Sequence, residues 1–246
     1  MYTLMWREFF SLLKSFKSIA VVAFFILVTF IISRFLGKLP YQFALGNTSP
    51  FLLSIRFLVG AFGFLFGLAL SHDILNREME SQTIRYLVTK TPRINLIAGK
   101  SLGIYLFWIF SVTVSFIIIS YYAKSFFLFS YIQLLSFMAY VVGFTIMLSF
   151  FIKKTTYSMF ISVILGILIP ALGAYVTAIK IDWDTLIFTL PVNNETGNLL
   201  VFIPYFLKFI LPYYYFSFDS ALSLIPFFLG VLFIILVIIL FKRSDL

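Results

Sequence analysis

The residues that could carry out chemistry are few in this chain. It contains no cysteine, and His72 is its single histidine, which excludes a disulfide framework, a thiol nucleophile and a histidine-rich metal centre. The nine acidic residues all lie at the ends of long apolar runs or between them. They therefore do not form the clustered carboxylates that an enzyme would need within an apolar segment. The sequence predicts a non-catalytic protein.

One short motif imitates a nucleotide site. Gly99-Lys100-Ser101 matches the end of a phosphate-binding loop, but that loop also requires a glycine five residues before Gly99, where this chain has Ile94. We therefore expect neither an ATP site nor any other cofactor or metal site in this chain.

The composition indicates that the protein is surrounded by lipid. Hydrophobic residues make up 62% of the 246 residues and charged residues 11%, which leaves too few polar groups to cover a water-soluble globule. The net charge of +9 comes from short basic clusters between the apolar runs. That distribution favours membrane lipids over nucleic acid as partners.

Six apolar runs are long enough to cross a bilayer as helices. They cover about 19–36, 51–70, 102–122, 131–152, 157–179 and 221–241. Residues 1–18 have a helical amphipathic period, which predicts an interfacial helix at the headgroup boundary. The alternative is that they form the solvent-exposed beginning of the first span. The stretch 199–216, which two prolines and a lysine interrupt, predicts short extracellular helices before the sixth span. The predicted fold is an all-α integral membrane protein with one domain over 1–246.

The basic residues set the expected orientation. Twelve of the eighteen lie in the segments before the first span, between spans two and three, between spans four and five, and after span six. Five lie in the other connecting segments, and one, Arg56, lies inside a span. The excess of Lys and Arg on cytoplasmic segments predicts that both termini are cytoplasmic.

The segment 71–101 between spans two and three holds the most organised charge. Asp73 and Arg77 are four residues apart and Arg77 and Glu80 three, so opposite charges stack along a helix that extends span two. Pro92 marks a helix boundary, with Thr91 as the cap and span three starting near it. The pattern predicts a helix, a break and another helix, which suits docking on another protein. The alternative is an interfacial loop held by lipid.

A family resemblance rests on this segment. The run Glu78-x-Glu80-Ser81-x-Thr83-Ile84-Arg85-x-Leu87, followed by Pro92 and Gly99-Lys100, resembles the coupling-helix loop of ATP-binding-cassette (ABC) type-2 exporter permeases. The order of amphipathic helix, six spans and a proline-bearing segment before the last is similar too. Gln82 stands where that family usually has glycine, so the resemblance does not predict the backbone conformation at this position.

The resemblance implies that the chain is the permease subunit of an ATP-driven exporter in a prokaryotic plasma membrane. It implies two copies of a separate nucleotide-binding subunit, which would hold ATP and Mg²⁺, and a second permease copy or a related permease. ATP binding would move the coupling helices and open the dimer outward. The residues in or beside the ATPase contact would be Glu78, Glu80, Thr83, Ile84, Arg85, Leu87 and Pro92.

Four residues are candidates for the cargo pathway. Arg56 either snorkels to the outer headgroups or faces a dimer cavity and binds an anionic group of the cargo. Gly63 and Gly67 have the spacing for close helix approach, within one subunit or at the dimer seam. Pro170 bends span five, as a structural kink or as a hinge. The aromatic share of 21% suits an amphipathic or hydrophobic cargo such as a peptide, a lipid or a drug.

Two other classes of function remain open. A secondary transporter driven by an ion gradient is disfavoured because no span carries a central Asp or Glu. A non-transporting membrane anchor that recruits a cytoplasmic ATPase would use the same projecting segment without moving cargo.

Overall fold

The computed structural model describes residues 1–38, 49–83, 92–178, 206–217 and 221–243. Within these ranges every regular element is a helix. Six helices are long and apolar enough to span a membrane, which confirms the prediction of a multi-pass α-helical protein. They are α2 (Phe16–Leu36), the run of α3 (Pro50–Phe57), η2 (Leu58–Gly63) and α4 (Phe64–Ser71), then α7 (Arg93–Ala123), α8 (Leu128–Phe151), α9 (Thr155–Ala178) and α12 (Ile225–Arg243) with the short η4 (Ala221–Leu224) before it.

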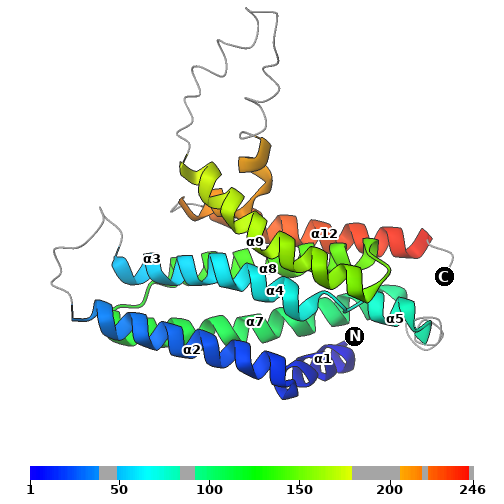
Figure 1. Cartoon of the computed structure of the whole chain (residues 1–246), viewed down its shortest axis with the longest axis horizontal. Coiled ribbons are helices and arrows are strands. Elements are labelled where there is room, and N and C mark those ends of the chain that lie inside the picture. Colours follow the sequence, from blue (N-terminus) through cyan, green and yellow to red (C-terminus); the bar gives the residue numbers. More distant parts are fainter. Residues whose placement is uncertain (39–48, 84–91, 179–205, 218–220, 244–246) are drawn as a thin grey trace, which may run out of the picture.

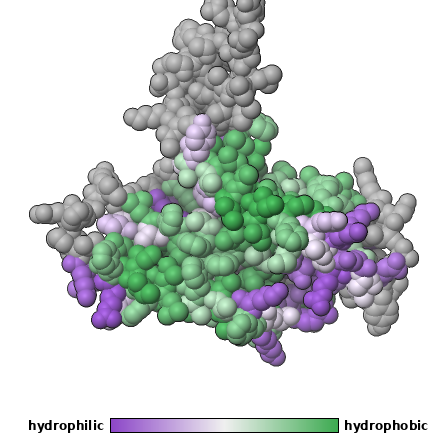
Figure 2. All heavy atoms as spheres, viewed as in Figure 1, coloured by the Kyte–Doolittle hydropathy of each residue, from purple (hydrophilic) through white to green (hydrophobic). Residues whose placement is uncertain are grey.

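The long helices α2, α7 and α8 and the run from α3 to α4 lie along the long axis of the molecule (Figure 1). The N-terminus, the end of α12 and the short helix α5 (Asn76–Glu80) lie at the same end of this bundle, which we call the α5 end. Hydrophilic residues gather toward the two ends of the long axis and a hydrophobic band lies between them (Figure 2). This arrangement places the membrane normal along the bundle.

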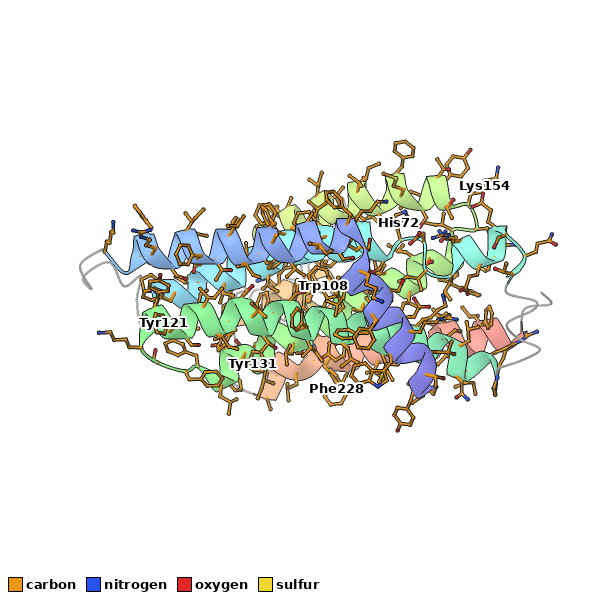
Figure 3. The ribbon with its side chains drawn as sticks, turned by 90° about the horizontal axis from the view of Figure 1, so that it is seen from below. His72, Trp108, Tyr121, Tyr131, Lys154 and Phe228 are labelled. Atoms are coloured by element: carbon orange, nitrogen blue, oxygen red, sulfur yellow. The ribbon has the colours of Figure 1, made fainter. Side chains whose placement is uncertain are left out.

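The first helix, α1 (Tyr2–Lys14), is separate from α2. The backbone at Ser15 is extended, with φ −72° and ψ 130°, and α2 begins at the next residue. The amphipathic helix is therefore shorter than the predicted 1–18. Figure 3 shows α1 crossing the bundle obliquely, whereas α2 follows the bundle axis.

The α8 helix lies at the centre of the packing. Gly143 of α8 meets Gly230 of α12 so closely that a Cβ at either position would overlap backbone atoms of the other helix. Between apolar helices in lipid, association depends on such close packing because lipid is as apolar as the helix surfaces. The glycine pair therefore sets the distance between α8 and α12.

Two features of the half of the bundle away from the α5 end were not predicted in this form. The second span contains a π-helical stretch, η2, which the sequence pattern did not predict. The segment before α12 forms short helices at 206–210 and at η3 (Pro212–Ser217), but it does not simply rest on the surface. The Tyr213 hydroxyl donates to the Gly60 carbonyl of η2 at 2.7 Å, and the Tyr213 ring packs against Phe64 and Phe137.

Candidate functional site

The turn that leads from the second span into α5 is tied to two other helices. The backbone N–H groups of Leu75 and Asn76 donate to the Ser149 hydroxyl of α8, at 2.9 and 3.3 Å. The Ser158 hydroxyl of α9 donates to the His72 carbonyl at 2.8 Å. Figure 3 places His72 at this end of the bundle and Tyr121 and Tyr131 at the other. The turn is therefore fixed to α8 and α9 and does not hang from the span as a free loop.

A buried ammonium group joins α5 to the bundle. The side chain of Lys100, on α7, is 6% exposed, and its Nζ lies 2.6 Å from Glu78 Oε1 and 3.7 Å from Glu8 Oε1. The same Nζ donates to the Ile74 carbonyl at 3.1 Å. A buried lysine is stable only when acceptors replace its lost hydration. Three elements, α1, α5 and α7, are thus held by one charge.

Close packing brings α1 to this charge. A Cβ on Gly99 of α7 would lie 3.0 Å from Leu4 Cβ, and one on Gly103 would lie 2.7 Å from the Met5 carbonyl oxygen. The two glycines lie on one face of α7, at the spacing that lets helices approach closely. Gly99-Lys100-Ser101, which imitates a phosphate-binding loop in the sequence, is therefore helix interior.

The other carboxylate of α5 binds the start of α9. Glu80 Oε2 accepts a hydrogen bond from the Thr155 hydroxyl at 2.7 Å and from the Thr155 backbone N–H at 3.1 Å. These two bonds, the hydroxyl first, hold the pKa of the Glu80 carboxyl below its usual value. A carboxylate is also favoured there because α9 begins at Thr155, and the first N–H groups of a helix have no acceptor within the helix. Because its pKa is lowered, Glu80 strengthens this link at neutral pH, and the link is lost as the pH falls through the lowered pKa.

Replacing Glu80 by alanine is expected to loosen the start of α9. The Thr155 N–H and hydroxyl lose their acceptor, so the amides of the first turn of α9 should exchange with solvent several-fold faster. Hydrogen exchange followed by mass spectrometry measures this change. Glu80→Gln retains an acceptor oxygen and should fall between the wild type and alanine. Equal exchange in all three proteins would show that the Glu80 contact does not hold α9.

Among the predicted docking residues that the structure describes, Glu78 and Glu80 bind other parts of the same chain, whereas Thr83 is exposed. Glu78 was expected at a partner contact, but its side chain is 18% exposed and turned inward to Lys100. Glu80 binds Thr155 within the chain. Thr83 is exposed, and its hydroxyl shares a hydrogen bond with the Ser81 hydroxyl at 2.8 Å. Arg77, 78% exposed and 4.0 Å from Asp73, points outward. Ile84, Arg85 and Leu87 lie outside the described residues.

The residue after Ser81 has an unusual backbone. Gln82 has φ 56°, the left-handed region that glycine adopts without steric cost. Gln82→Gly should therefore stabilise this turn by about 1 kcal/mol, whereas the β-branched Gln82→Val should destabilise it by at least as much. Thermal unfolding of the purified protein compares the two variants. Similar melting temperatures for both would contradict the left-handed turn.

The start of α7, which follows the α5 segment in the chain, is bound to α12. Pro92 immediately precedes α7, which begins at Arg93, one residue later than predicted. The Arg93 guanidinium donates to the carbonyls of Phe241 and Lys242, at 2.8 and 3.3 Å, and lies over the Phe241 ring. A cation at these last carbonyls stabilises the C-terminal end of α12.

A second site lies in the half of the bundle away from the α5 end. A hollow of about 390 Å³ opens between α3, η2, α9 and η3. It brings Arg56 and Pro170, two of the predicted pathway residues, together with Phe57, Tyr213 and Phe216. The Arg56 guanidinium is half-buried and donates to Gln133 Oε1 of α8 at 2.7 Å. Apolar walls around one cationic group suit an amphipathic molecule.

The other two predicted pathway residues, Gly63 and Gly67, do not line this hollow. A Cβ on Gly63 would lie 3.3 Å from Met138 Sδ, and one on Gly67 would overlap the Val141 side chain. Both neighbours belong to α8 of the same chain, so these glycines pack the second span against α8.

The sequence did not reveal the partners of the α5 segment. Lys100 was counted among the basic residues between spans two and three, and nothing in the sequence linked it to Glu8. The signal that was available is the Gly99–Gly103 spacing around Lys100, which marks a close helix crossing. Comparison with protein families and with curated proteins finds no match to this chain.

Proposed function

We propose that this protein is the membrane-spanning permease subunit of an ATP-driven exporter whose ATPase is a separate chain. The observation that carries the proposal is the attachment of α5 to the bundle by the buried Lys100, which binds Glu78 and Glu8 at once. A segment that only tethered two spans would not need a buried charge shared with two other helices.

The contacts of α5 and of the turn before it connect them mechanically to other helices of the bundle. A push on the exposed Arg77 of α5, or on Thr83 just after this helix, is transmitted to α7 through Lys100 and to α9 through Thr155. The segment also reaches α8 through Ser149, and the start of α7 reaches α12 through Arg93. Packed helices with few discrete arrangements transmit such displacements. In this proposal the α5 end is cytoplasmic, and ATP-driven closure of two ATPase subunits supplies the push.

The turn at Gln82 supports the same proposal. In the ABC type-2 permease family that the sequence resembles, glycine usually stands at this position, and Gln82 has the φ of 56° that glycine favours. The docking surface in this proposal consists of Arg77, Ser81 and Thr83, with Ile84, Arg85 and Leu87 following them along the chain. Glu78 and Glu80 are positioning residues that hold this surface to the bundle.

The cargo in this proposal is amphipathic or hydrophobic. The hollow beside Arg56 offers aromatic walls at Phe57, Tyr213 and Phe216 and one guanidinium, a combination that binds an apolar body with an acidic or polar end. Pro170 removes a backbone donor from α9 at the wall of this hollow, where bending would change its width.

Copurification tests the proposal. Tagged protein extracted from its own membranes should bring with it an ATPase chain and a second permease copy or a related permease. ATP hydrolysis by the reconstituted complex should rise when an amphipathic cargo is added. Copurification without cargo stimulation would favour a membrane anchor. Transport that needs an ion gradient, without any ATPase, would favour a secondary transporter.

A further inference from the structure

The face of α1 that is turned away from the bundle carries two adjacent stripes. Tyr2, Trp6 and Phe10 are spaced four residues apart and are 71%, 49% and 50% exposed, and the ring of Trp6 stacks on Phe10. Arg7 and Lys14 are exposed beside them. Amphipathic aromatic rings next to basic side chains are typical of a helix at the headgroup layer.

The position of α1 agrees with that layer. The apolar span α2 starts at Phe16, only two residues after the end of α1 at Lys14. The chain therefore bends at Ser15, immediately before the apolar span begins, and α1 crosses the bundle obliquely (Figure 3). Basic side chains at this level meet the phosphate groups of lipids, and anionic lipids attract them most strongly.

Charges of alternating sign connect this face to α5. Arg7 Nη2 lies 3.3 Å from Glu8 Oε1, and the same Oε1 lies 3.7 Å from Lys100 Nζ. Lys100 in turn lies 2.6 Å from Glu78. A headgroup phosphate that binds Arg7 competes with Glu8 for that guanidinium. Glu8 is then freed to compete with Glu78 for the single ammonium of Lys100.

We infer that α1 is a binding site for anionic phospholipid headgroups, formed by Arg7 and Lys14, and that its occupancy is transmitted through Glu8 and Lys100 to α5. The binding site stands independently, whereas the regulatory meaning of the transmitted change rests on the proposed function. Anionic lipid in the leaflet at the α5 end would thus adjust how firmly α5 is held.

Local quenching tests the binding site. The chain has no native cysteine, so a fluorophore on the Ser11→Cys variant reports only from the exposed side of α1. In nanodiscs of phosphatidylcholine, spin-labelled phosphatidylglycerol should quench it at a lower lipid fraction than spin-labelled phosphatidylcholine does. Arg7→Gln and Lys14→Gln should each raise the required fraction of phosphatidylglycerol about fivefold.

The matched control removes two charges from the same end of the bundle but outside α1, as Lys153→Gln with Lys242→Gln, and should leave the quenching unchanged. Equal quenching by the two lipids, or quenching that neither α1 substitution changes, would show that Arg7 and Lys14 do not form an anionic-lipid site. So would absence of lipid quenching together with energy transfer between labelled copies, because a second copy would then cover α1.

A spin label on Arg77→Cys tests the transmission to α5. Its mobility should differ between phosphatidylcholine and phosphatidylglycerol nanodiscs, and Glu8→Gln should abolish the difference while quenching at α1 persists. If the mobility of the label at position 77 is the same in both lipids, or if the difference persists in Glu8→Gln, the transmission from α1 to α5 is refuted. Neither measurement needs an ATPase, so failure here is distinct from failure of the exporter proposal.

Discussion

Replacing Lys100 by methionine is expected to destabilise the protein by about 3–5 kcal/mol, because it leaves the carboxylate of Glu78 buried without its counter-charge. The loss should be largest at the α5 end, where α1 and α5 both depend on this ammonium group. Unfolding of the purified protein in a denaturing detergent measures the free energy. Faster hydrogen exchange in α1 and α5 than in α12 would localise the change.

The double variant Lys100→Met with Glu78→Met distinguishes a lost partner from a generally damaged core. Two apolar side chains of similar volume can replace a buried ion pair at little cost, so the double variant should recover most of the stability lost by Lys100→Met. Additive losses would contradict direct coupling of the two residues.

Alanine at Gly143 is expected to force α8 and α12 apart. The added Cβ would overlap the Gly230 carbonyl, and backbone atoms cannot move aside as a flexible side chain can. Overpacking of this kind costs about 1–3 kcal/mol or more. Gly230→Ala should have a similar effect, and the double variant should cost less than the sum because both substitutions widen the same gap. Thermal unfolding of the three variants measures these costs.

Gly60→Ala is the matched control for this glycine pair. Its Cβ would lie 3.4 Å from the Tyr213 ring, an ordinary contact with a side chain. Little change is expected there. Equal destabilisation at Gly60 and Gly143 would mean that loss of glycine itself, and not the helix crossing, causes the effect.

The number and approximate limits of the spans follow from apolar length alone. The runs 19–36, 131–152 and 221–241 correspond to α2, α8 and α12 within a few residues, because lipid requires long, internally hydrogen-bonded helices. Length and hydropathy do not report helix contacts, so the crossing of α8 and α12 at Gly143 and Gly230 was not predicted.

The contacts of the α5 segment were only partly predicted, because the sequence does not show toward which helix each side chain points. The charges at Asp73, Arg77 and Glu80 fit a helix with stacked ion pairs, and the structure places Arg77 4.0 Å from Asp73. Glu80 instead binds Thr155, which is 75 residues away in the chain. Such a partner has no local signal in the sequence. The π-helical stretch η2 was not predicted either. Its Gly60 carbonyl accepts a hydrogen bond from the Tyr213 hydroxyl, and that partner is 153 residues away in the chain.

The most direct test of the exporter proposal places a photoreactive amino acid at position 77, on the exposed side of α5, and irradiates the protein in its own membranes. The account predicts a covalent adduct with a nucleotide-hydrolysing subunit, and none from the same group at Tyr121, which is 79% exposed at the opposite end of the bundle. Adducts from position 77 with lipid alone, or with proteins outside the cell, would contradict it.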